Sequence, residues 1–395
     1  MTSPIFSVTP KNPTRSIVLL AVAAFASQAQ VRVTDSLLPQ IAADFETTVG
    51  AAAIVVTGYV IAHGSIQLLI GPVGDRFGKY LTITVTALVA SILVMMCGMA
   101  QSLPQLATAR LLAGAAAGCV VPLSMAYVGD VTPYGHRQPV LGRYMSGQIF
   151  GQAAGGVLGD LFGWRNVFFL LGGLFALAAA ALAFELLANP ATRVPGRPEE
   201  TSRGFASDYV AVLSSRWARF VIFVVLLESA FAWGVFAFVG ADLNQRFGLS
   251  FTAVGLVVGS FGIGGLMYTG SVGQLVRLFG QRGLAIGGGA LCAIAYLTLA
   301  TGAAWWLAPA AVMAIGLGFY ALHNTLQTNA TQMTPQARGT AVAIFSSAIY
   351  FGQTAGVAAG ALAFDRFGAK PLFIATAAAL PALAWWFARE LQRHW

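Results

Sequence analysis

The chain has 395 residues, of which 57% are hydrophobic and only 9% are Asp, Glu, Lys or Arg. Soluble domains usually carry about 25% charged residues, so this composition excludes a soluble globular protein and predicts that apolar surface faces lipid. The formal net charge is +8, but the basic residues gather in short loops between apolar segments. That distribution indicates membrane topology rather than nucleic-acid binding.

Apolar segments long enough to cross a bilayer recur along the whole chain. A spanning helix needs about 20 mostly apolar residues, and open strands are excluded because lipid cannot satisfy their backbone groups. The first span follows Lys11 and Arg15 directly, and we expect no cleavable signal peptide. We predict an all-α membrane protein with twelve transmembrane helices, at 15–38, 50–70, 80–100, 105–129, 140–161, 166–188, 217–240, 250–272, 283–302, 307–331, 338–362 and 371–388.

The basic residues are distributed unequally between the two sets of loops. Sixteen Lys and Arg residues fall on one side of the predicted membrane and four on the other, with Arg32 and Arg110 inside helices. The positive-inside rule therefore places both termini in the cytoplasm of a multi-pass protein of the inner (plasma) membrane. An odd number of helices would break this alternation, so the asymmetry also supports twelve.

One long polar segment, "NPATRVPGRPEETSRGFASDYV" at 189–210, divides the chain into similar halves. "FGQAAGG" at 150–156 matches "FGQTAGV" at 351–357, and "VTP" ending at Pro133 matches "MTP" ending at Pro335. Six helices thus occur twice, which is typical of secondary transporters with a substrate site near the midplane. We predict a six-helix bundle at 1–188, a cytoplasmic linker at 189–216 and a second, pseudo-symmetric bundle at 217–395.

The segment "GPVGDRFGKY" at 71–80 concentrates charge and glycine between the second and third predicted spans. It resembles the signature loop of the major facilitator superfamily, and Tyr80 replaces the second basic residue of that pattern. The resemblance implies a cytoplasmic latch that joins the two halves in the outward-open state, with an acid at the inner end of the fourth span as a partner. The predicted latch residues are Gly71, Asp75, Arg76, Gly78, Lys79 and Asp130.

Two further motifs resemble those of proton-coupled members of that family. "LATARLLAGAAAG" at 106–118 has the Arg110 and Gly114 of the fourth-span motif, with Ala113 in place of glutamine. "GQIFGQAAGG" at 147–156 has the glycines of the fifth-span antiporter motif, but Gln152 replaces its proline. Glycines four residues apart form a helix face for close packing. The resemblance implies a drug:proton antiporter, and the missing proline leaves an importer open.

Ionisable groups inside spans are expensive, and they are functional candidates by default. Asp35 lies near Arg32 in the first span, where the two could simply neutralise each other. Glu228 has no basic residue nearby in sequence, which makes it a candidate proton carrier or a buried hydrogen-bond donor. Each also has a packing alternative, Arg110 as an interhelical hydrogen-bond donor among them. The proton-coupling candidates are Asp35, Glu228, Arg110 and His323.

Polar stripes at helical spacing run along several predicted spans, and they are too polar to face lipid. We expect them to line a wet cavity, although a single His or aromatic residue is more often packed in a core. Trp233 could stack on a flat or cationic ligand. The cavity candidates are Gln28, Arg32, Tyr59, His63, Gln67, Gln148, Gln152, Trp233, Tyr320, Asn324, Gln327, Tyr350 and Gln353.

No sequence pattern indicates an enzyme. The chain has no GxxxxGK[ST] loop for ATP and no metal-ligand spacing, so we expect no cofactor and no metal. The predicted function is efflux of small organic molecules by proton antiport with alternating access. The alternative is a proton symporter that imports an organic anion held by Arg32 and Arg110. A non-transporting membrane receptor or scaffold is a third hypothesis. The expected partners are a small-molecule substrate, protons and the lipid bilayer, and we expect a monomer that binds no nucleic acid.

Overall fold

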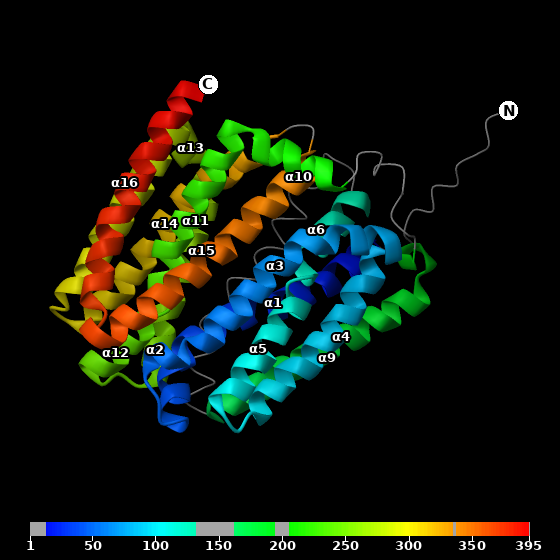
Figure 1. Cartoon of the computed structure of the whole chain (residues 1–395), viewed down its shortest axis with the longest axis horizontal. Coiled ribbons are helices and arrows are strands. Elements are labelled where there is room, and N and C mark those ends of the chain that lie inside the picture. Colours follow the sequence, from blue (N-terminus) through cyan, green and yellow to red (C-terminus); the bar gives the residue numbers. More distant parts are fainter. Residues whose placement is uncertain (1–12, 132–161, 194–204, 335–336, 395) are drawn as a thin grey trace.

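The computed structural model describes residues 13–131, 162–193, 205–334 and 337–394, and this part of the chain is helical throughout, without strands (Figure 1). The first half contains α1 (Pro13–Asp44), α2 (Val49–Ala52), α3 (Ile54–Phe77), α4 (Lys79–Met99), α5 (Leu103–Ala117), α6 (Val120–Val131) and α9 (Trp164–Ala188). The second half contains α11 (Arg216–Phe236), α12 (Val239–Phe247), α13 (Phe251–Thr301), α14 (Ala308–Ala330), α15 (Arg338–Phe367) and α16 (Lys370–His394), and α10 (Phe205–Ser214) precedes it.

The predicted spans overlap these helices except for 140–161, which lies outside the described residues. The span predicted at 105–129 is divided between α5 and α6, and the one at 217–240 extends from α11 into α12. The spans predicted at 250–272 and 283–302 form the single 51-residue α13, whose helical geometry breaks at Gly280 (φ 60°, ψ 177°). Within the described residues, 9 helices are long and apolar enough to cross a membrane, or 10 if α1, bent by 43°, counts as one. The lower number partly reflects the merging of two predicted spans in α13.

Serine and threonine side chains start several of these helices. Thr48 accepts a hydrogen bond from the Ala51 amide at the start of α2. Ser215 and Ser250 accept in the same way from residues three positions later, at the starts of α11 and α13. Such caps satisfy amide groups that have no partner within the helix. The sequence therefore fixes these helix ends locally.

Small residues bring neighbouring helices into backbone contact. A Cβ at Gly114 in α5 would collide with the carbonyl oxygen of Tyr59 in α3. In the second half, a Cβ at Gly352 or Gly356 of α15 would collide with the carbonyl of Leu226 or Ala230 in α11. Helices in a membrane associate largely through such close packing, because lipid tails are as apolar as leucine side chains.

The two halves meet along α3 and α15. The Ser347 hydroxyl in α15 donates to the Gly64 carbonyl in α3 at 2.8 Å, and α2 also contacts α15. The last turn of α15 therefore lies beside the start of α2, and α1 contacts α12 at the same end. We call this end the outer face, after the predicted orientation, and the end with the last turn of α16 the inner face.

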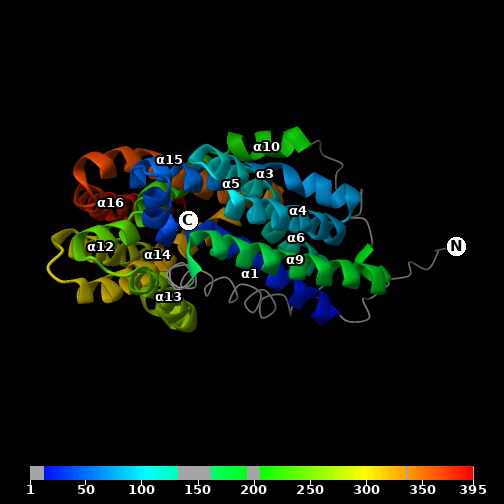
Figure 2. The ribbon, with the colours of Figure 1, turned by 90° about the horizontal axis from the view of Figure 1, so that it is seen from below.

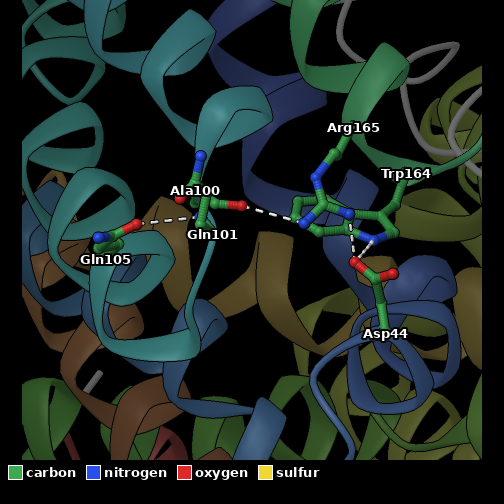
Figure 3. A network of polar contacts seen from close by, with 6 residues as sticks. All are labelled: Asp44, Ala100, Gln101, Gln105, Trp164 and Arg165. Atoms are coloured by element: carbon green, nitrogen blue, oxygen red, sulfur yellow. Dashed lines mark hydrogen bonds and ion pairs between the residues drawn. The ribbon is translucent and has the colours of Figure 1, made fainter.

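The outer end of the first half is held by one polar network (Figure 3). The Asp44 carboxylate at the end of α1 pairs with Arg165 and accepts from the Trp164 indole at 3.2 Å. Arg165 also donates to the Ala100 carbonyl at 3.0 Å. The network joins the end of α1, the start of α9 and the turn between α4 and α5, and all of its members belong to one half.

The short helix α10 lies at the inner face, beside α3 and α15 (Figure 2). The Tyr209 hydroxyl in α10 donates to the Leu68 carbonyl in α3 at 2.7 Å. Because α10 also packs on α11 and α15, the end of the predicted linker touches both halves of the chain.

Candidate functional site

A buried acid–imidazole pair joins α11 and α14. Glu228 Oε2 lies 2.8 Å from His323 Nδ1. The Glu228 side chain is fully buried, and that of His323 is 12% exposed. The second carboxylate oxygen, Oε1, is buried and has no hydrogen-bond partner among the described residues. Which atom carries the shared proton depends on the tautomer of His323.

Aromatic rings hold the imidazole in place. Phe319, one turn earlier in α14, stacks on His323 with ring centroids 4.8 Å apart and an angle of 14° between the ring planes. Phe345 of α15 lies 5.8 Å away on another side. Trp233 of α11 packs edge-on against Phe319 at 4.7 Å. The pair thus sits in an apolar environment where charge–charge interactions are weakly screened.

Arg110 forms a second buried polar cluster, between α5, α1 and α3. Its Nε donates to the Val55 carbonyl at 3.1 Å, and Nη1 donates to Gln30 Oε1 at 2.7 Å. Nη2 donates to the Gln30 carbonyl and to Thr34 Oγ1, each at 3.1 Å. The guanidinium also lies 3.9 Å from the Tyr59 ring centroid. These hydrogen-bond acceptors are all neutral. Because they lie in α1 and α3, Arg110 of α5 connects three helices of one half.

Asp35 lies one residue beyond Thr34 in α1, is 2% exposed, and interacts electrostatically with Arg110. Asp35 thus lies in the same helix that supplies two of the hydrogen-bond partners of Arg110. Buried charges are retained when they are paired and hydrogen-bonded. The side chain of Arg32 lies outside the described residues, so the predicted Arg32–Asp35 pair stays a prediction.

His63 occupies the interface between the halves. Its ring lies 5.6 Å from Tyr59 of α3 and 4.7 Å from Tyr350 of α15. The residue is fully buried, and neither ring nitrogen has a hydrogen-bond partner among the described residues. This aromatic contact fills the α3–α15 crossing next to Gly64, where a Cβ would lie 2.6 Å from Tyr350 Cβ.

The polar stripes are divided between buried and partly exposed positions. Asn324 Nδ2 donates to the Tyr268 hydroxyl at 3.0 Å, which ties the stripe of α14 to α13. Partly exposed candidates are Gln28, Tyr320, Asn324, Gln327 and Tyr350, and buried ones are Tyr59, His63, Gln67, Trp233 and Gln353. The buried members pack against neighbouring helices in this conformation, and their role as cavity lining stays a prediction. Gln148, Gln152 and the side chain of Arg32 lie outside the described residues.

The predicted latch forms one contact within the first half. Lys79 Nζ, at the start of α4, lies 2.6 Å from Asp130 Oδ2 in α6. Both residues belong to the first half, so this pair does not itself connect the two halves. Gly71, Arg76 and Gly78 lie at the same inner end of α3, and the Asp75 side chain lies outside the described residues. The latch function stays a prediction.

Sequence reasoning missed the partners of Arg110. Gln30 and Thr34 are spaced four residues apart in α1, and this spacing could have identified them as one face. They lie beside the stripe of Gln28, Arg32 and Asp35 that was singled out. The pairing of Glu228 with His323 was also missed, because both residues were recognised as candidates but 95 positions separate them.

A family comparison identifies the architecture that carries these clusters. Residues 20–356 match the model described as Major Facilitator Superfamily, and residues 221–395 match it as well. The chain belongs to the Major Facilitator Superfamily. Members of this family are transporters, so the predictions of an all-α membrane transporter and of a protein that is not an enzyme are confirmed.

Curated relatives and a solved structure cover most of the chain. The uncharacterized MFS-type transporter YwfA of Bacillus subtilis (strain 168) is 26% identical over 86% of this chain and 83% of its own length. Multidrug resistance protein 1 of the same organism is 25% identical over 81% and 83%. A crystal structure of a variant of the nucleoside transporter NupG superimposes with a TM-score of 0.79 at 12% identity, covering 94% of this chain and 98% of that chain. This last similarity supports the fold alone.

Proposed function

We propose that this secondary transporter exports small organic molecules by proton antiport and that the Glu228–His323 pair binds the proton. The observation that carries the proposal is the 2.8 Å contact between a fully buried carboxyl group and an imidazole on two helices of one half. Imidazole is the side chain whose ordinary pKa lies within the physiological pH range. A carboxyl–imidazole pair therefore places two proton-binding groups in direct contact.

The chemistry of the pair follows from its burial. An isolated buried carboxylate is costly, and a protonated imidazole at 2.8 Å offsets that cost. With one proton on the pair, α11 and α14 are held together by an ion pair or a neutral hydrogen bond. A second proton neutralises the carboxylate and leaves a cationic imidazole, while loss of the first leaves a buried carboxylate beside a neutral imidazole, with no positive charge to offset it. Each protonation state thus favours a different α11–α14 arrangement, and an arrangement that binds substrate less tightly would couple proton entry to export.

The direction of transport is inferred from a relative and from the surroundings of Arg110. A relative of similar length is described as a multidrug resistance protein, and export is the corresponding reading for this chain. The import alternative used Arg32 and Arg110 to bind a carboxylate, and the Arg32 side chain lies outside the described residues. Arg110 is fully buried, and its nitrogens already donate to Gln30, Thr34 and Val55. A carboxylate ligand would have to displace these acceptors, so we favour export.

The test is flux in reconstituted vesicles with an imposed pH gradient, with cationic, neutral and anionic compounds screened first on the parent protein. Glu228→Gln keeps the side-chain volume but removes the ionisable group. We expect it to abolish uphill transport driven by the gradient and to retain substrate exchange without a gradient. Ser229→Ala is the matched control, since Ser229 is the next residue, is also buried, and its hydroxyl has no hydrogen-bond partner among the described residues.

Uphill, gradient-driven flux that survives in Glu228→Gln at the parent rate would refute proton binding at this pair. Glu228→Gln could also lose both uphill flux and exchange. That loss would be assigned to a folding or binding defect only if Ser229→Ala lost both as well. If the imposed gradient drove an anion across the membrane in the same direction as the protons, import by symport would replace export.

A further inference from the structure

We propose that Asp365 is an outer gating residue, whose carboxylate holds the two halves together at the outer face and must release them once in each transport cycle. Asp365 Oδ2 accepts from the Thr48 hydroxyl at 2.5 Å, and Oδ1 accepts from the Gly50 amide at 2.9 Å. Thr48 and Gly50 start α2 in the first half, and Asp365 lies in the last turn of α15 in the second. The proposal rests on transport by alternating access and not on proton coupling.

The position of Asp365 is unfavourable within its own helix. The last turn of a helix carries partial negative charge, which repels a carboxylate, whereas exposed amide groups at a helix start attract one. Asp365 ends α15, and its hydrogen-bond partners are a capping hydroxyl and an amide at the start of α2. The carboxylate is therefore stabilised across the interface rather than within α15.

The fit around the carboxylate is close. A Cβ on Gly50 would lie 2.5 Å from both the Ala361 carbonyl oxygen and the carboxyl carbon of Asp365. A glycine at this position lets the α2 backbone reach α15, and a larger residue would push the two apart. Closer to the inner face, α15 and α3, which follows α2 directly, are joined by the Ser347–Gly64 hydrogen bond. The contact of Asp365 is thus the outer end of a continuous α3–α15 interface.

Other outer carboxylates bond within their own half. Asp44 pairs with Arg165 and Trp164 in the first half. Asp242 pairs with Arg246 four residues later, with Oδ1 2.6 Å from Nη2. Each ion pair between described residues likewise joins residues of one half. The carboxylate of Asp365 instead accepts both of its hydrogen bonds from the other half.

Alternating access requires the outer ends of the halves to part when the substrate site opens outward. The two bonds of Asp365 exist only while α2 and α15 are in contact, so they stabilise the outer-closed state selectively. A contact that is made in one state and lost in the other shifts the equilibrium by its own free energy. Because the contact is exposed to solvent, we expect a modest contribution.

The test measures the distance between the halves directly. Spin labels are placed at Gln101 and Ala303, which are exposed in outer loops of the first and second halves, after the buried cysteines Cys97, Cys119 and Cys292 are replaced by alanine. We expect Asp365→Asn to raise the ratio of long to short distances by about fivefold. Thr48→Val should raise it less, because the Gly50 amide is still available. Asp242→Asn, the matched control, should leave the ratio unchanged.

A second measurement guards against misfolding of these variants. Replacing Thr48 and Asp365 by a pair of cysteines allows oxidation to lock the outer face. We expect oxidation to stop transport and reduction to restore it. The proposal fails if Asp365→Asn gives the same distances as the parent, or if the oxidised pair transports at the parent rate. Neither readout needs a pH gradient, so failure here would leave the Glu228–His323 proposal standing, and loss of proton coupling would leave the gate standing.

Discussion

Glu228 Oε2 and His323 Nδ1 lie 2.8 Å apart, although 95 positions separate the two residues in the sequence. The pair links α11 to α14 inside one half, and stacked Phe319 limits the freedom of the imidazole. The geometry of the pair therefore depends on the spacing of α11 and α14. Arg110, by contrast, is bonded to neutral acceptors of the first half. The two buried clusters thus have different chemistry, one able to exchange protons and one with a permanent charge.

His323→Gln tests the imidazole separately from the carboxylate. Glutamine can still hydrogen-bond to Glu228 but carries no ionisable group, so we expect transport to depend less on pH than in the parent. The measurement is the initial rate of exchange and of uphill flux over a series of pH values. Phe345→Leu, which changes a ring near the imidazole but no proton-binding group, should keep the parent profile. An unchanged profile in His323→Gln would contradict a role in proton binding.

Arg110 is predicted to be a structural residue of the first half. Arg110→Lys keeps the charge but loses the fork that reaches Gln30, Thr34 and Val55, and we expect it to lower stability by about 1–3 kcal/mol. Asp35→Asn should also lower stability, because it removes the negative charge that offsets Arg110. Thermal unfolding followed by a thiol-reactive dye measures both, since Cys97, Cys119 and Cys292 are buried in the folded state. If either variant kept parent stability and lost only proton-driven flux, the residue would belong to the coupling machinery.

Much of this architecture could be predicted from the sequence, because lipid imposes one simple requirement. Hydrophobic segments of about 20 residues must become helices, and the boundaries of α4 and α9 lie within a few residues of the predicted ones. The form of the connections was less predictable. The two predicted spans at 250–272 and 283–302 are the two arms of α13, and they meet at a kink at Gly280, where the backbone has a positive φ.

The candidate site could be predicted only in part. The rarity of charge identified Glu228 and Arg110, because each ionisable residue in a span is exceptional. The partners of these residues are set by helix packing, and a local sequence pattern does not show which helices pack together. Gln30 faces Arg110 and Glu228 faces His323 because of how the helices cross, and the sequence analysis did not identify Asp365.

The Lys79–Asp130 pair gives a prediction about conformation rather than stability. An exposed ion pair contributes about 0–1 kcal/mol, and Asp130 is 56% exposed, so Lys79→Ala should barely change thermal stability. If the inner loop acts as a latch, the same variant should favour the inward-open state and slow transport. Distances between labels on the inner ends of the two halves measure this. The double variant Lys79→Asp and Asp130→Lys restores the ion pair with its charges reversed, and it should recover part of the transport rate. The latch would be contradicted if neither Lys79→Ala nor the double variant changed the distances between the inner ends.

Tyr209 provides a prediction about pH. Burial raises the pKa of the Tyr209 hydroxyl above its ordinary value of about 10, so the neutral hydroxyl that donates to Leu68 is favoured in the folded state. A raised folded pKa means that this stabilisation is complete below pH 10 and is lost as pH rises through the folded value. We expect Tyr209→Phe to unfold at a lower temperature than the parent at pH 8, and the difference to vanish at higher alkaline pH. A difference that did not depend on pH would assign the effect to packing alone.

Gly356 in the repeated segment that begins "FGQ" is predicted to set the distance between α11 and α15. A Cβ there would collide with the Ala230 carbonyl, and α15 would have to move away from the helix that carries Glu228. Overpacking of this kind typically costs about 1–3 kcal/mol, so Gly356→Ala should lower the unfolding temperature and weaken proton-driven flux. Gly173→Ala is the control, because a Cβ at that position in α9 meets no atom within 4 Å and alanine favours a helix. Equal unfolding temperatures for the two variants would show that α11 and α15 can separate without cost, and the glycine of the repeat would then have no packing role.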